Sequence, residues 1–436
     1  MKRSALARCV LSIGAVLALL AGCSSPQTQG VPESGMRATR NIKHAIRPAS
    51  SYQVLYSFTR DPHRFLGGVF PYAPLLEVNG TMYGTTSDGG TGCHPYGCGT
   101  VYSISPSGAK RVIYRFQGGS GDGFGPMAGL IDLNGTLYGT TLHGGGTGCD
   151  FGYGCGTVYS ITPAGTETVL HKFTGPSYDG AYPDASLIDV NGILYGTTSE
   201  GGKSSCGIAG GCGTVYSITT NGSETVLHSF GGGKDGYSPI GLIDVNGTIY
   251  GTTFDGGSGC PPQGCGTFYS MSTGGSKKTL HVFGGGSKGR GPDAALIDVN
   301  GTLYGTTGFG GTGCFPFGCG TGFSVSLKGT TRVLYQFAGG STDGSLPHGL
   351  TYMNGIFYGT TQNDGRSGCT AYNCGTVYSL STAGQETVLH TFTDVPDGSK
   401  PVSELINVNG TLYGTTVNGG SAKCHDGCGT VFRLTP

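Results

Sequence analysis

The sequence predicts an all-β fold, a seven-bladed β-propeller made of four-stranded units that close into a ring. Three observations in the 436 residues lead to this fold class. A tetrapeptide recurs seven times, every repeat contains the same turn signal, and the start of the folded part supplies a strand that its end lacks. A four-stranded unit repeated every ~40–50 residues is typical of propeller blades.

The repeat is marked by Tyr-Gly-Thr-Thr, whose copies start 54 to 57 residues apart. β-Branched and aromatic residues fill the runs around it, as strands prefer. In the unit that covers residues 187–230, we expect strands at 187–190, 194–198, 213–218 and 224–230. The seven copies begin at Tyr83, Tyr138, Tyr195, Tyr250, Tyr304, Tyr358 and Tyr413.

The turn signal is an Asn-Gly pair between the first two apolar runs of each unit. A two-residue type I′ turn needs positive φ at both positions, so Asn-Gly in this place predicts a β-hairpin. All seven units keep the pair, with the asparagine at Asn79, Asn134, Asn191, Asn246, Asn300, Asn354 and Asn409.

The two ends of the repeat region complement each other. The last unit stops at residues 431–434, after its third strand, whereas residues 51–58 match the fourth-strand pattern and precede the first hairpin. The first segment can therefore complete the last blade. Closure protects strand edges that would otherwise be exposed, which favours a ring over an open solenoid.

The N-terminal residues read as export and anchoring signals. A basic start, an apolar run and small residues predict a signal peptide over residues 1–22. Leu-Ala-Gly-Cys at 20–23 resembles the lipobox of bacterial lipoproteins, which implies lipid attachment at Cys23. Residues 23–50 are then a flexible tether, and residues 51–436 are the propeller. The alternative is an ordinary signal peptide with a chance cysteine. We expect an exported, lipid-anchored envelope protein at the outer membrane or cell surface.

Fourteen of the 16 cysteines form seven local pairs, one in each loop between the second and third strands. Closely paired cysteines in an exported chain predict disulfides. A zinc site needs four ligands, whereas each loop offers two cysteines and only two loops add a histidine, His94 or His425. We therefore expect no metal and no cofactor. The predicted pairs are Cys93–Cys98, Cys149–Cys155, Cys206–Cys212, Cys260–Cys265, Cys314–Cys319, Cys369–Cys374 and Cys424–Cys428.

Charge and loop placement restrict the partners. With 25 basic and 25 acidic side chains, binding driven by phosphate neutralisation is not expected, so nucleic acid is excluded as a partner. The long cysteine loops share one face with the links between blades, and loops on a rigid scaffold often carry function. Aromatic side chains there suit sugar stacking or a protein partner, or else pack on neighbouring loops. The candidate ligand-binding residues are His94, Tyr96, Phe151, Tyr153, Phe315, Phe317 and Tyr372.

Five of the links contain Asp-Gly-x-x-Pro, with the aspartates at 122, 179, 235, 343 and 397. Either these carboxylates form a ring that binds cations, or each Asp caps its own turn while Gly and Pro set the bend. Gly67 and Lys288 replace Asp in the other two links, which weakens a symmetric ion site. A fourth-strand position occupied by His in four units and by Tyr in three suggests half-buried packing rather than catalysis.

Whole units, such as Val-Asn-Gly-Thr-Leu-Tyr-Gly-Thr-Thr, resemble the GloVer-type tandem repeat of bacterial surface proteins with a choice of anchor. The resemblance covers roughly residues 52–436 and implies no catalytic residues. We therefore expect a monomeric, non-enzymatic surface module that displays or binds a polysaccharide or protein, with the lipid as its only membrane contact. The alternatives are a propeller-type hydrolase or lyase, and a purely structural envelope component.

Overall fold

The computed structural model describes residues 50–60, 66–93, 95–146, 148–149, 152–177, 179–203, 210–365 and 374–436. They belong to one compact unit, Pro48–Pro436. The other unit, Met1–Arg47, lies outside the described residues, as do the predicted signal peptide and Cys23. Within the described part of the chain, no helix has the length and apolar character needed to cross a membrane.

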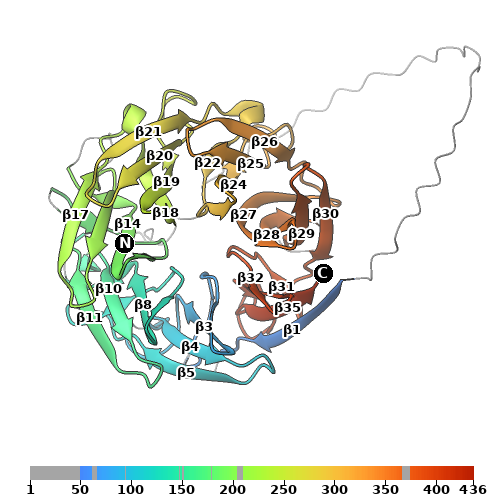
Figure 1. Ribbon diagram of the computed structural model, residues 1–436. Helices are drawn as coiled ribbons and strands as arrows, with labels where there is room; N and C mark the ends of the chain where they lie inside the picture. The colour runs from blue at the N-terminus through green and yellow to red at the C-terminus, as the bar shows by residue number, and fades with distance from the viewer. Residues whose placement is uncertain are drawn as a thin grey trace, which may run out of the picture. The chain divides into compact units, whose positions relative to one another are not determined.

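The unit is all-β and consists of antiparallel sheets arranged as blades around a ring (Figure 1). Each of the first four blades contains four strands in sequence order. Their bounds are β2 (Leu76–Val78), β3 (Thr81–Thr86), β4 (Thr100–Ile104) and β5 (Lys110–Arg115); β7 (Ile131–Leu133), β8 (Thr136–Thr141), β10 (Thr157–Ile161) and β11 (Glu167–Lys172); β13 (Ile188–Val190), β14 (Ile193–Thr198), β16 (Thr214–Ile218) and β17 (Glu224–Ser229); β18 (Tyr237–Val245), β19 (Thr248–Asp255), β20 (Thr267–Ser272) and β21 (Lys277–Val282).

The remaining three blades follow the same order, except that the last takes its fourth strand from the start of the unit. Short strands in the links pair beside several blades. The bounds are β23 (Ile297–Val299), β24 (Thr302–Phe309), β25 (Thr321–Ser326) and β26 (Thr331–Gln336); β27 (Gly344–Met353), β28 (Ile356–Asp364), β29 (Thr376–Ser381) and β30 (Glu386–Thr391); β32 (Ile406–Val408), β33 (Thr411–Thr416), β35 (Thr430–Thr435) and β1 (Ser51–Ser57). The additional short strands in the links are β6 (Gly123–Phe124), β12 (Gly180–Ala181), β22 (Arg290–Pro292) and β31 (Gly398–Ser399). Those in the cysteine loops are β9 (His143–Gly144), β15 (Glu200–Gly201) and β34 (Asn418–Gly419), which pair with β6, β12 and β31.

The predicted closure is confirmed. β1 pairs antiparallel with β35, so that the sheet of the seventh blade runs β1-β35-β33-β32. The first strands of neighbouring blades contact one another all the way round, including β32 against β2 across the seam. The ring is therefore complete and has seven blades, with first strands on its inside and fourth strands on its outside (Figure 1).

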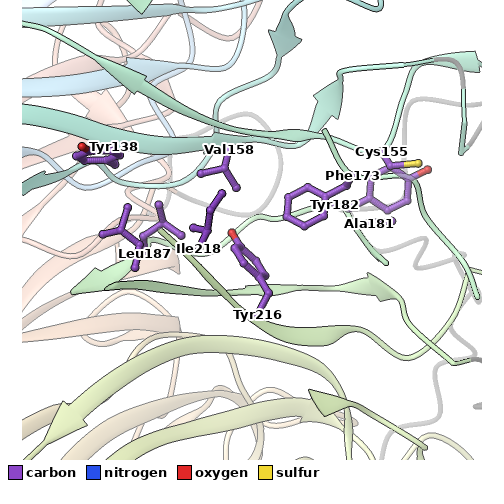
Figure 2. Close-up of a cluster of buried hydrophobic side chains, with 10 residues drawn as sticks. Tyr138, Cys155, Val158, Phe173, Ala181, Tyr182, Leu187, Tyr216 and Ile218 are labelled. Atoms are coloured by element: carbon purple, nitrogen blue, oxygen red, sulfur yellow. The ribbon is translucent and has the colours of Figure 1, made fainter. Parts of the chain in front are cut away.

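The hydrophobic core is divided into seven clusters, and each fills the junction between two adjacent blades. Figure 2 shows the cluster between the second and third blades, where Phe173 and Tyr138 of one blade meet Leu187 and Tyr216 of the next. The seam between the seventh and first blades has an equivalent cluster, to which β1 is joined through Phe58. Blades are thus held together mainly by apolar packing between sheets.

The glycine and both threonines of the Tyr-Gly-Thr-Thr motif have structural roles, as the third blade illustrates. A Cβ on Gly196 would lie 2.5 Å from the Tyr216 hydroxyl, so only glycine fits beside this buried ring. Thr197 donates to the carbonyl of Ile240 on β18 of the next blade at 3.3 Å. Thr198 is hydrogen-bonded to the hydroxyl of Thr214 on the third strand at 2.8 Å. The repeat is therefore explained by packing and hydrogen bonding without any ligand.

The hairpin asparagines all have φ between 51° and 55°, and the glycines after them also have positive φ. This confirms the type I′ turns. The first strands of the fourth and sixth blades, β18 and β27, begin earlier than the pattern predicts and contain a bulge. Their links have one residue fewer between Pro and the Asn-Gly turn, so the chain stays paired with the second strand instead of looping out.

Candidate functional site

The loops between second and third strands are closed by disulfides. Five bridges lie wholly within the described residues: Cys93–Cys98, Cys149–Cys155, Cys260–Cys265, Cys314–Cys319 and Cys424–Cys428. Cys212 and Cys374 are also disulfide-bonded, but their predicted partners, Cys206 and Cys369, lie outside the described residues. Disulfides persist in oxidising compartments, so they indicate an exported protein, extracellular or periplasmic.

Aromatic side chains project from these loops. Phe315 is 99% exposed, Tyr96 and Tyr153 are each 55% exposed, and Phe317 is 45% exposed. The alternative in which the rings are covered by neighbouring loops therefore does not apply to Phe315, although Phe317 touches Phe309 and Tyr153 touches Phe124 at their ring edges. The other three candidates, His94, Phe151 and Tyr372, lie outside the described residues.

The Asp-Gly-x-x-Pro links form hydrogen-bonded caps. Asp343 accepts from the Ala338 amide at 2.7 Å and from the Tyr335 hydroxyl at 2.9 Å through Oδ2, and from the Gly344 amide at 2.7 Å through Oδ1. Asp122 makes the matching bonds to Gln117, Tyr114 and Gly123. These contacts agree with the turn-capping interpretation rather than with a symmetric ring of cation-binding carboxylates.

The residue at the fourth-strand His/Tyr position packs against a phenylalanine and, in five of the blades, also contacts an aspartate. Its ring lies edge-on to the phenylalanine two residues later, as in His228 against Phe230, and it also pairs with the Asp of the following link. His171, His228 and His390 face Asp179, Asp235 and Asp397 at 3.3, 3.0 and 3.1 Å. Sequence reasoning missed this pairing. The signal was that the Asp follows the His or Tyr by seven or eight residues in five links.

The residue at the start of the fourth strand in the next blade lies beside each pair of His or Tyr with a link Asp, and forms a polar group of three with that pair. Glu224 occupies this position between the second and third blades, and Lys277 occupies it between the third and fourth. Burial raises the pKa of Glu224 to about 7; His171 opposes the shift electrostatically, and Asp179 adds to it. Sequence reasoning did not single out Glu224, because a charged residue at a strand end ordinarily faces solvent.

A second cluster of polar groups lies at the inner ends of the fifth to seventh blades. His348 on β27 places Nδ1 3.8 Å from Oδ2 of Asp293, and its Nε2 lies 3.3 Å from the Gln362 side chain on β28. Burial raises the pKa of Asp293 to about 8. Burial also lowers the pKa of His348 to about 4, although its hydrogen bond to Gln362 acts in the opposite direction. Glu404, which packs against Gly349, has its pKa raised to about 7 by burial. Both shifts favour the uncharged forms of Asp293 and His348, and the other blades do not repeat this pair.

Fold and loops together define the class: a disulfide-stabilised, seven-bladed propeller built from tandem repeats, with aromatic side chains on its cysteine loops. The family is defined by sequence. Residues 42–210 and 207–432 match the Gloeobacter/Verrucomicrobia repeat, and the chain belongs to that family. None of the curated proteins matches the chain.

Solved structures resemble the chain in fold only. A computationally designed protein is 13% identical with a TM-score of 0.45, over 87% of this chain and 99% of its own. A gluconolactonase from Xanthomonas campestris is 12% identical with a TM-score of 0.41, over 88% and 89% of the two chains. A luciferin-regenerating enzyme is 14% identical with a TM-score of 0.40, over 69% and 88%. At these values the likeness says nothing about activity.

Proposed function

We propose that this protein is a non-enzymatic binding and display module of the cell envelope, anchored through lipid at Cys23, that holds a polysaccharide or protein ligand on the cysteine loops. The observation that carries the proposal is the exposure of Tyr96, Tyr153, Phe315 and Phe317 on loops that disulfides close. The disulfides are consistent with the export that such a role requires.

Exposed rings on constrained loops are suited to binding. Full burial of a Phe side chain is worth about 1.5–3 kcal/mol, so displaying one in water forgoes a large stabilisation. A ring face offers a stacking surface to a sugar, and a ring held by a short disulfide loop loses little conformational freedom when it binds. Single exposed apolar residues are common on protein surfaces, but here four occur on one kind of loop.

A glycan-array screen of the chain from residue 24 onward tests the proposal. We expect binding to one polysaccharide class, and we expect Phe315→Ala and Tyr153→Ala each to weaken it by about tenfold, because each removes roughly 1–1.5 kcal/mol of ring contact. The matched control is Tyr352→Ala. Tyr352 is also exposed, at 39%, but it adjoins an Asn-Gly turn at the opposite ends of the strands, so its removal leaves binding unchanged.

The proposal is contradicted if no glycan on the array binds and no protein ligand is captured from envelope extracts. It is also contradicted if Tyr352→Ala weakens binding as much as the loop variants do. The second candidate function, hydrolysis or elimination, is favoured by one observation, the unrepeated Asp293–His348 pair. It predicts turnover of model glycosides, lactones or esters that His348→Ala abolishes. Such turnover would replace the binding role with an enzymatic one.

Anchoring through Cys23 has its own test. Cells that express the protein are fed a fatty-acid analogue, and the purified chain is assayed for label. We expect strong labelling of the parent and none of Cys23→Ala, because that thiol and the amino group exposed by cleavage are the acylated atoms in lipoproteins with this tetrad. Equal labelling of the two chains refutes the anchor while leaving the propeller intact.

A further inference from the structure

The junction between the second and third blades brings together three side chains that bind metals elsewhere. His171 is on β11, Asp179 is in the link, and Glu224 begins β17. One ligand atom from each lies within 4.8 Å of the other two. Among the described residues, no other group of three His, Cys, Asp or Glu side chains brings its ligand atoms within this distance.

The group contains a carboxyl oxygen that finds no hydrogen-bond partner in the described part of the chain. Asp179 receives hydrogen bonds from the Thr174 and Gly180 amides, and its side chain is only 13% exposed. Glu224 Oε1 is a buried atom with no hydrogen-bond partner among the described residues, as are the equivalent atoms Glu167 Oε1 and Glu386 Oε1 at two other junctions. Two carboxylates thus face one imidazole in a half-buried place, where an unpaired buried oxygen is costly.

The neighbouring junction shows what satisfies this position. Between the third and fourth blades, Lys277 replaces Glu224, and its ammonium lies 2.7 Å from Asp235 Oδ1 while His228 lies 3.0 Å from Oδ2 of the same carboxylate. Lys277 Nζ also donates to the Asp235 carbonyl at 2.9 Å. A positive charge is therefore built into the equivalent site one repeat further along the chain.

Other junctions place a phenol where this one has an imidazole or a carboxyl group. Where Tyr takes the His position, its hydroxyl donates to Asp, as Tyr114 does to Asp122 and, at 3.5 Å, to Glu167. Between the sixth and seventh blades, Tyr52 takes the Glu position and stacks on His390. The combination of imidazole and two carboxylates with neither phenol nor ammonium occurs at the junction of the second and third blades alone.

We propose that His171, Asp179 and Glu224 bind one divalent transition-metal ion of the zinc type. An imidazole nitrogen with two carboxylate oxygens suits such an ion better than Ca²⁺ or Mg²⁺, which prefer all-oxygen sites. Ligand atoms in a tetrahedral zinc site lie about 3.3 Å apart. His171 Nε2 and Asp179 Oδ2 are already 3.3 Å apart, and one ligand atom of each of the three side chains lies within 4.8 Å of the other two.

The ion ties the fourth strand of one blade, the link and the fourth strand of the next blade into one cross-link. It does at this junction what the Lys277 ammonium does at the next. The proposal concerns stability and does not depend on the ligand of the cysteine loops.

The test uses the chain from residue 24 onward, without a polyhistidine tag, freed of metal with EDTA and titrated calorimetrically with ZnCl₂. We expect one Zn²⁺ per chain and a rise in the thermal midpoint on binding. His171→Tyr copies the phenol of the neighbouring junction, and Glu224→Lys copies Lys277; both keep side chains that this fold already accepts there. Each should weaken Zn²⁺ binding by more than about tenfold without lowering the midpoint measured in EDTA.

The reciprocal variant Tyr114→His gives its junction the same three groups, with Asp122 and Glu167, and should raise the stoichiometry from one Zn²⁺ to two. The proposal is overturned if the parent binds no Zn²⁺, if His171→Tyr and Glu224→Lys bind as tightly as the parent, or if Ca²⁺ binds as tightly as Zn²⁺. A parent that binds one Zn²⁺ lost in both variants supports it even if Tyr114→His fails to fold.

Discussion

Replacing Phe58 with alanine should destabilise the propeller by about 3–5 kcal/mol, the cost of emptying a well-packed aromatic site in a core. Phe58 has no exposed surface, and its ring meets Tyr102 of the first blade edge-on at a centroid distance of 5.4 Å. Its amide donates to the Gly429 carbonyl of the seventh blade at 2.9 Å. The residue therefore joins both sides of the seam where the ring closes.

Thermal unfolding under oxidising conditions measures the effect, and two variants calibrate it. Phe230→Ala removes the equivalent ring between the third and fourth blades, which meets Tyr269 at 5.5 Å, so the two losses should agree. Gln53 lies on β1, and its exposed side chain accepts hydrogen bonds from Arg433. Gln53→Ala should therefore cost less than about 1 kcal/mol. A negligible loss for Phe58→Ala beside a large one for Phe230→Ala would mean that β1 does not close the ring.

Replacing Asp343 with alanine should cost about 2–4 kcal/mol, because three donors lose their acceptor at a buried site. The Tyr335 hydroxyl and the Ala338 and Gly344 amides all point at this carboxylate, which is only 6% exposed. A buried donor left without a partner costs about 1–3 kcal/mol, and the losses at one site are not additive. Urea unfolding of parent and variant gives the difference.

The matched control is Asp298→Ala, which removes an exposed carboxylate that caps the Gly301 amide of a hairpin turn at 2.9 Å. It should cost about 1 kcal/mol or less. Asp343→Asn keeps the shape of the side chain but turns one acceptor into a donor, so its loss should lie between the two. Equal effects of Asp343→Ala and Asp298→Ala would show that the link aspartates do not act as buried caps.

The strands, their turns and the number of blades could be predicted because each is set by residues close together in the chain. Asn-Gly accepts the positive φ that Asn191 and Gly192 adopt, and runs of β-branched and aromatic residues fit the pleated sheet. Closure was also predictable, since a fourth strand is missing at one end of the repeat and present at the other. The exposed loop aromatics were predicted from their place in the long cysteine loops.

The polar groups between blades could not be predicted in the same way. The repeat period shows that His171 and Glu224 occupy related positions, but they lie 53 residues apart and on different sheets. Whether they meet depends on the angle and spacing at which two blades pack. The same holds for Asp293, which follows β22, and His348 on β27 of the next blade, which approach to 3.8 Å.

The sequence by itself determined the seven-unit ring and the local pairing of the cysteines in the described loops, because these depend on short motifs and on counting. The tertiary structure alone decided which charged side chains meet at each junction, which link aspartates act as buried caps, and that Phe315 stands free in solvent. The physical reason is that local steric preferences act over a few residues, whereas desolvation and charge pairing depend on every element that packs around a group.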